Sequence, residues 1–146
     1  MPYWITWEHE GLVATFAGDC PIAELRDAFE EIHCDARVAD LRYQIFDHRQ
    51  VPHREVTDSQ LNEIVGLDGA REPTHPRSLY ASVSATPGRV DLIDYFIWLN
   101  AHPECLRQCA TVEEAREWIR VQLSSGRSGS PIRQTSAGRA PDARRC

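Results

Sequence analysis

Strand-like and helix-like segments alternate along this chain, and this alternation constrains the fold more than any other feature. Apolar and polar side chains alternate with a period of two over residues 3–8, which predicts a strand. Residues 12–17 predict a second strand, and the turn that contains Gly11 would join the two in an antiparallel hairpin. From residue 12 on, each strand-like segment is followed by one that resembles a helix. The order β-β-α-β-α-β-α-β-α predicts a single small α/β domain with a mixed, largely parallel five-stranded sheet.

Capping and turn residues set the remaining boundaries. Pro21 is suited to the first turn of a helix, and Thr57 and Thr111 each begin a capping-box pattern. The Thr86-Pro87 pair is expected to cap the third helix. The further strands are expected over residues 41–47, 78–85 and 104–110, and the further helices over about 57–69, 86–101 and 111–123. A polar loop is expected over residues 48–56.

The middle strands are not apolar throughout. Gln44 and Ser82 each lie between apolar neighbours. A sheet covered by helices on both faces would show continuous apolar strands. We therefore expect the helices mainly on one face, with the other face left to water or to a partner.

The domain is expected over residues 1–123 and a disordered tail over residues 124–146, which are mostly Ser, Gly, Arg, Pro and Ala. The first region carries a net charge of −10 and the tail +4. Because an acidic domain repels phosphates, we expect no nucleic-acid binding by the fold. No apolar stretch is long enough to span a bilayer, and the N-terminus does not resemble a signal peptide, so we expect a cytoplasmic protein.

Three segments carry a resemblance to a known family: residues 5–8 with 12–18, residues 40–47 (Asp-Leu-Arg-Tyr-Gln-Ile-Phe-Asp), and residues 111–119. Together they resemble the SpoIIAA-like branch of STAS-like domains. The resemblance implies a mixed sheet with interspersed helices and a non-enzymatic binding or regulatory module. Some relatives act in anti-sigma partner switching, and others are suspected carriers of small apolar ligands.

Ser59 is a candidate phosphoacceptor by the same resemblance. Partner-switching STAS proteins have an Asp-Ser-Ser-Gly-like motif at the start of the helix that follows the third strand. Here Asp58-Ser59-Gln60 stands in a comparable place, but the second serine and the glycine are missing. The alternative is that Thr57, Asp58 and Ser59 only cap the helix.

Asp47, His48 and His53 are candidates for acid–base or metal chemistry, because they follow a strand at the sheet edge where α/β proteins bind ligands. The alternative is that both histidines are solvated loop residues. Cys105 and Cys109 would be too far apart on a strand for a disulfide, which favours ordinary packing. We assign no catalytic residue, no metal ligand and no cofactor.

The third helix is apolar around more than one face. It includes Tyr95, Phe96, Trp98 and Leu99. Such a helix is buried on more than one side, either in its own core or against a partner. The first hypothesis is a binding or regulatory module that associates with an unidentified protein or with a second copy of itself, as a homodimer. The alternative is a carrier of a small apolar ligand or lipid in a pocket beneath this helix, and a small metal-dependent or acid–base enzyme is the third.

Overall fold

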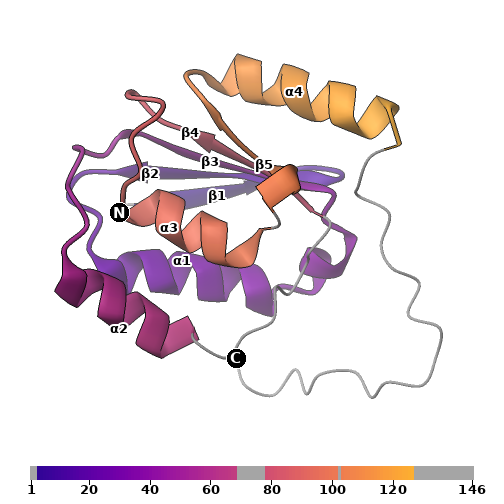
Figure 1. The fold of residues 1–146 in the computed structure, drawn as a ribbon. Coiled ribbons are helices and arrows are strands. Elements are labelled where there is room, and N and C mark those ends of the chain that lie inside the picture. The colour runs from indigo at the N-terminus through magenta and orange to yellow at the C-terminus, as the bar shows by residue number, and fades with distance from the viewer. Residues whose placement is uncertain (1–2, 69–77, 102, 127–146) are drawn as a thin grey trace.

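The computed structural model describes residues 3–68, 78–101 and 103–126 and forms one five-stranded sheet with helices on both sides (Figure 1). The strands are β1 (Tyr3–Trp7), β2 (Gly11–Ala17), β3 (Tyr43–Gln50), β4 (Leu79–Val83) and β5 (Leu106–Cys109). The helices are α1 (Ile22–Cys34), α2 (Asp58–Asp68), α3 (Leu92–Asn100) and α4 (Val112–Ser124). The predicted order and the predicted α/β class with a mixed five-stranded sheet are confirmed.

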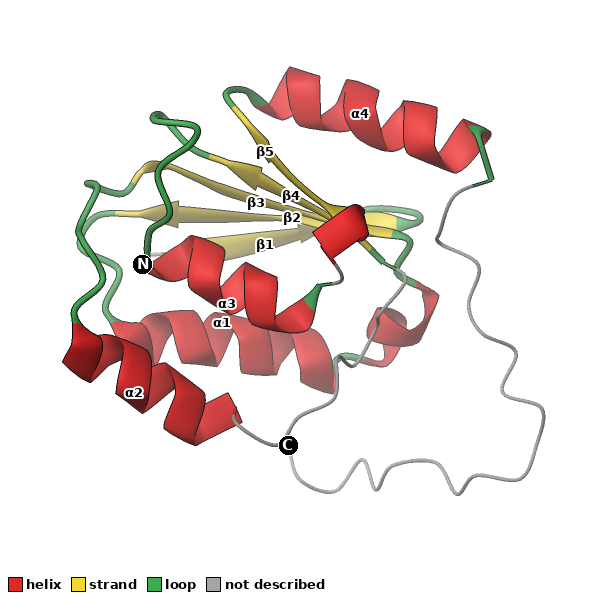
Figure 2. Cartoon of the chain, viewed as in Figure 1, coloured by secondary structure: helices red, strands yellow, loops and turns green. Residues whose placement is uncertain are grey.

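The strands lie in the sheet in the order in which they occur in the chain, β1-β2-β3-β4-β5. β1 pairs antiparallel with β2, and every later pair is parallel. Right-handed crossovers that always step in the same direction place their helices on the same face of the sheet. Accordingly α1, α2 and α3 lie on one side, whereas α4, which follows the last strand, lies on the other (Figure 2).

The sheet separates two apolar cores. On the α1–α3 side, Phe46 stacks against Phe29 of α1 and Tyr80 of β4, with ring centroids 5.2 and 6.0 Å apart, and Phe29 stacks against Phe96 of α3. On the other side α4 packs on β3, β4 and β5, where Ala115 and Ile119 join the buried core.

The expectation that one face would be left open is wrong where α4 covers the sheet. Ile45, Ala81 and Val83 are buried on the α4 side. The polar residues Gln44 and Ser82 are buried too, and they belong to the opposite face with Phe46 and Tyr80. The sequence shows the alternation correctly, but the polar positions take part in buried hydrogen bonds rather than facing water.

Three boundaries near the carboxyl edge of the sheet and around α3 differ from the prediction in ways that bear on the site. β3 continues to Gln50, so His48 lies in a strand and not in a loop. α3 begins at Leu92 with Asp91 as its N-cap, and Thr86-Pro87 lies in the preceding loop. β5 begins at Leu106, after a 3-10 turn over residues 103–105.

Of the three predicted threonine caps, those at Thr57 and Thr111 are confirmed. The backbone N–H of Gln60 donates to Thr57 and its side chain accepts from the Thr57 N–H, while Thr111 accepts from the N–H of Glu114. α4 ends at Ser124, one residue past the expected domain end, and the predicted tail falls mainly on residues 127–146, outside the described residues. In the described part of the chain, every helix is too short or too polar to cross a membrane.

Candidate functional site

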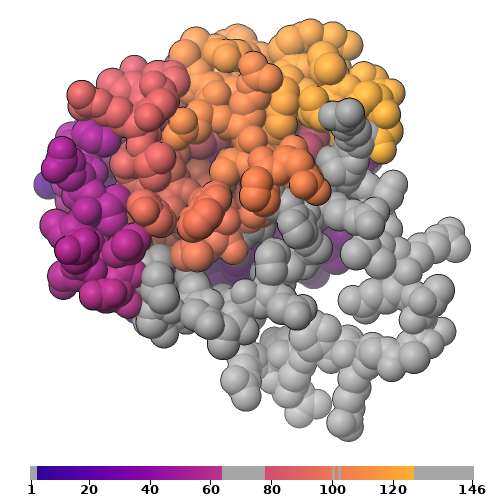
Figure 3. Space-filling view, viewed as in Figure 1, coloured from indigo at the N-terminus to yellow at the C-terminus, as the bar shows by residue number. Residues whose placement is uncertain are grey.

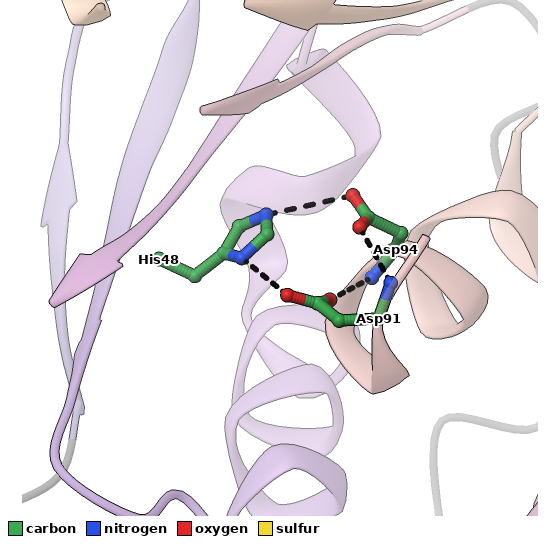
Figure 4. A group of neighbouring side chains, drawn as sticks. All are labelled: His48, Asp91 and Asp94. Atoms are coloured by element: carbon green, nitrogen blue, oxygen red, sulfur yellow. Dashed lines mark hydrogen bonds and ion pairs between the residues drawn. The ribbon is translucent and has the colours of Figure 1, made fainter. Parts of the chain in front are cut away.

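A cluster of buried polar side chains lies where β3 and β4 end and α3 begins. His48 comes from β3 and Ser82 from β4, and Asp91 and Asp94 come from the N-terminus of α3. All four are buried, and His48 is only 2% exposed. In Figure 4 the imidazole of His48 faces both carboxylates, with one ring nitrogen toward each. This is the carboxyl edge of a parallel sheet, at which α/β domains commonly bind ligands.

Local sequence explains how each side chain reaches the cluster. His48 has the same strand parity as Gln44 and Phe46, so it points to the α1–α3 side. Asp91 accepts hydrogen bonds from the backbone N–H of Ile93 (2.9 Å) and of Asp94 (3.0 Å). Asp94 accepts in return from the Asp91 N–H at 2.9 Å. This capping box holds both carboxylates at a helix N-terminus, where the helix dipole favours negative charge.

The imidazole contacts a different partner at each nitrogen. Nδ1 lies 3.0 Å from Oδ2 of Asp91, and because its N–H is poorly aligned with that oxygen, the contact is an ion pair rather than a linear hydrogen bond. Nε2 lies 2.8 Å from Oγ of Ser82 and 3.5 Å from Oδ1 of Asp94. The Ser82 hydroxyl donates to Oδ1 of Asp94 through a short contact.

The carboxylates determine the charge of His48. Burial alone would lower its pKa, but the contacts with Asp91 and Asp94 outweigh burial and raise the pKa to about 9. For the Asp94 carboxyl, burial alone would raise the pKa. Its contacts with His48 and Ser82 instead hold that pKa below its usual range. At neutral pH the imidazole is therefore a cation, and both of its nitrogens are donors.

A pocket of about 400 Å³ opens next to this cluster, between α3 and β5; we call it the α3–β5 pocket. Its lining residues are Ser82, Val90, Asp94, Tyr95, Trp98, Leu106 and Gln108. Two members of the buried cluster, Ser82 and Asp94, thus form part of its polar floor. Trp98, which is 54% exposed, stands at its rim, and its ring meets that of Tyr95 edge-on with centroids 6.2 Å apart. Figure 3 shows the surface around α3. The loop before α3 and α3 itself, coloured pink to orange, lie between the start of α2 and α4.

The order Asp91–His48–Ser82 resembles a catalytic triad in its contacts, but two features oppose acyl transfer at Ser82. A protonated His48 cannot accept the Ser82 proton, as a general base must. The carboxylate of Asp94 also lies beside Ser82 Oγ, where the negative charge of a tetrahedral intermediate would develop. The arrangement is better suited to hold a fixed pattern of charges and hydrogen bonds.

His48, Asp91 and Asp94 also offer three donor atoms within 4.8 Å of one another, and imidazole with carboxylates is a donor set that suits Zn²⁺. The two ring nitrogens, however, face different carboxylates. A single ion would have to displace the imidazole proton and break one of these ion pairs. The mutual ion pairs of these three side chains are sufficient to explain why they lie close together.

The structure separates the three loop candidates of the sequence. His48 belongs to the cluster. Asp47 points to the opposite face of the sheet and pairs with Arg49, whose guanidinium nitrogens lie 2.9 Å from the carboxylate oxygens. These contacts lower the pKa of Asp47, although burial alone would raise it. His53 lies exposed in the loop after β3. The prediction that His48 lies in the loop is therefore wrong, whereas His53 fits the alternative of a solvated loop histidine.

The third-helix candidates divide between core and pocket. Phe96 is buried against Phe29, and Leu99 packs at the edge of the same core. Tyr95 and Trp98 line the α3–β5 pocket, so the pocket lies beside the helix rather than beneath Phe96. Ser59 is exposed in the first turn of α2, just after the Thr57 cap. Cys105 and Cys109 are buried against α4, as ordinary packing predicts.

Sequence reasoning missed Ser82, Asp91 and Asp94 as site residues. Asp91-Leu-Ile-Asp94 has capping-box spacing and could have marked the start of α3. Comparison of the chain with protein-family models, with functionally characterised proteins and with solved structures finds no match. The case for the site therefore rests on its geometry.

Proposed function

We propose that this protein binds a small molecule in the α3–β5 pocket. The observation that carries the proposal is the pocket itself, which combines a volume of about 400 Å³ with aromatic and aliphatic walls and a few polar groups at its floor. This size and this division of polar and apolar surface are typical of small-molecule sites. The proposal follows the carrier hypothesis from the sequence and places its pocket at the side of α3.

The floor of the pocket is held rigidly, which supports a binding role. Ser82 lies in the parallel sheet, and Asp94 is tied to the α3 capping box and to His48. Gln108 accepts a hydrogen bond from the Gly88 N–H at 3.1 Å. Groups that are already positioned lose little conformational entropy when a ligand binds.

A second candidate function is association with a protein partner or with a second copy of the chain. Val90 and Trp98 are each 54% exposed and lie together at the pocket rim. Exposed large apolar side chains that are grouped in this way are typical of interaction sites. We also propose a STAS-like domain, and the order of elements supports this assignment; neither binding function depends on it.

Native mass spectrometry tests the proposed function. The full chain is purified without detergent under reducing conditions, as wild type and as the variants Trp98→Ala and Trp4→Ala. Trp4 is the matched control, because it is 48% exposed but lies in β1, at the opposite edge of the sheet from β5. We expect a bound mass, co-purified or added from a fragment library, on the wild type and on Trp4→Ala and its loss from Trp98→Ala.

Two outcomes contradict the proposal. A bound mass that is retained equally by Trp98→Ala places the ligand elsewhere. An apo mass in all three proteins throughout the library, together with a dimer that Trp98→Asp dissociates, favours the association function instead.

A further inference from the structure

The hydrogens of the buried cluster are directed away from the α3–β5 pocket. The protonated His48 forms an ion pair with Asp91 through Nδ1, and its Nε2–H donates to Ser82. Because Ser82 accepts from His48, its own hydroxyl hydrogen goes to Asp94. At the floor of the pocket, Ser82 and Asp94 can therefore only accept hydrogen bonds. A ligand that binds there must donate them.

The charge of the cluster also favours a ligand that donates hydrogen bonds over an anionic one. Two carboxylates, Asp91 and Asp94, surround a single imidazolium, which leaves an excess of negative charge that the N-terminus of α3 offsets only in part. Asp94 is the carboxylate at the pocket. Among the described residues that line the pocket, none has a basic side chain, so an anionic ligand would meet the Asp94 carboxylate without a cation at the pocket to offset the repulsion.

The walls suit the rest of such a ligand. Tyr95 and Trp98 present aromatic rings, and Val90 and Leu106 present aliphatic surface. Aromatic faces attract cations as well as apolar groups. We therefore propose that the pocket takes a small organic amine, with an apolar or aromatic body against Tyr95 and Trp98 and a protonated amino group at Ser82 and Asp94. This inference rests on the proposed function and names the class of its ligand.

Three probes of matched shape test the inference: 2-phenylethylamine, 2-phenylethanol and 3-phenylpropionate, which carry a cationic, a neutral and an anionic head. Binding to the full chain is measured by isothermal titration calorimetry at pH 7 and low ionic strength. Both the amine and the alcohol can donate a hydrogen bond to the Asp94 carboxylate, but only the amine adds a positive charge opposite it. We therefore expect the amine to bind roughly 10-fold more tightly than the alcohol, which corresponds to about 1.4 kcal/mol, and the propionate most weakly.

Variants locate the head group. Asp94→Asn should reduce the affinity of the amine to that of the alcohol, with the alcohol itself little changed. Because Asp94 also caps α3, a second pair of variants at half-buried Gln108 leaves the cap intact. Gln108→Glu should strengthen and Gln108→Arg should weaken amine binding several-fold, in opposite order to their effect on the propionate.

The failures are distinguishable. Equal binding of amine and alcohol, or tightest binding of the propionate, with Trp98→Ala weakening the probe that binds, overturns the amine inference and leaves the proposed pocket standing. Absence of binding by all three probes overturns the amine inference and contradicts the proposed function as well.

Discussion

The ion pairs of His48 predict that the protein loses stability as the pH rises from 6.5 to about 9. The folded-state pKa of about 9 exceeds the ordinary value of 6.5, so the folded protein holds this proton more tightly than the unfolded chain does. The stabilisation is fully present below pH 6.5 and is lost as the pH rises through the folded pKa. A difference of this size corresponds to about 3 kcal/mol, of which about 2 kcal/mol should disappear between pH 6 and pH 8.5.

Urea unfolding of the wild type at half-unit intervals from pH 6 to pH 8.5 measures this loss. The variant His48→Gln should be less stable at pH 6 and nearly flat over the same interval, because it has no proton to lose. His53→Gln, at an exposed histidine, should keep the slope of the wild type. If His48→Gln retains the wild-type slope, the carboxylates do not hold a protonated imidazole, and the described charge pattern of the site is wrong.

Three further substitutions, the last with a matched control at Ser59, test the fold by chemical denaturation. Phe46→Ala removes a fully buried ring that stacks on Phe29 and Tyr80 and should cost about 3–5 kcal/mol; a cost below 1 kcal/mol would contradict the described core. Gly11→Ala places a Cβ against the ring of Tyr43, which is itself bonded to Glu8, and should cost about 1–3 kcal/mol with a folded circular dichroism spectrum; a neutral effect would mean that the ring can move freely. Thr57→Ala removes the α2 cap and should cost about 1 kcal/mol, whereas Ser59→Ala, with no role in that cap, should change the unfolding free energy by less than 0.5 kcal/mol.

Local patterns were sufficient for most of the fold. The hairpin of β1 and β2, the capping boxes at Thr57 and Thr111, and the periodicity of α1 and α4 are determined by residues close in sequence, so the order of elements was predictable. The parallel order of β2 to β5 then follows from short right-handed crossovers.

The prediction of a solvent-facing polar face of the sheet failed because of contacts between neighbouring strands. Gln44 donates to the Tyr80 hydroxyl at 3.0 Å, so two polar groups satisfy each other inside the α1–α3 core. Sequence shows that such residues are polar but not that they have found a partner on the neighbouring strand. The same holds for His48, whose polarity suggested a loop although it continues the inward parity of Phe46.

The site depends on contacts between distant residues. His48 meets Ser82 across neighbouring strands and meets Asp91 only because α3 begins at the same edge of the sheet. Its position at the carboxyl edge was expected, but the partners were not. The pocket likewise requires β5 beside α3, since Leu106 and Gln108 form part of its lining.

The indole N–H signals of the four tryptophans provide a direct test of the proposed small-molecule site between α3 and β5. A ¹⁵N-labelled sample of the full chain is titrated with a library of small aromatic fragments, amines included, and followed by two-dimensional NMR. The described site predicts that fragments which bind shift the signal of Trp98, at the pocket rim, and leave those of Trp4 and Trp118 in place. Fragments that shift Trp4 or Trp118 but not Trp98, or a library that moves no indole signal, would contradict the claim.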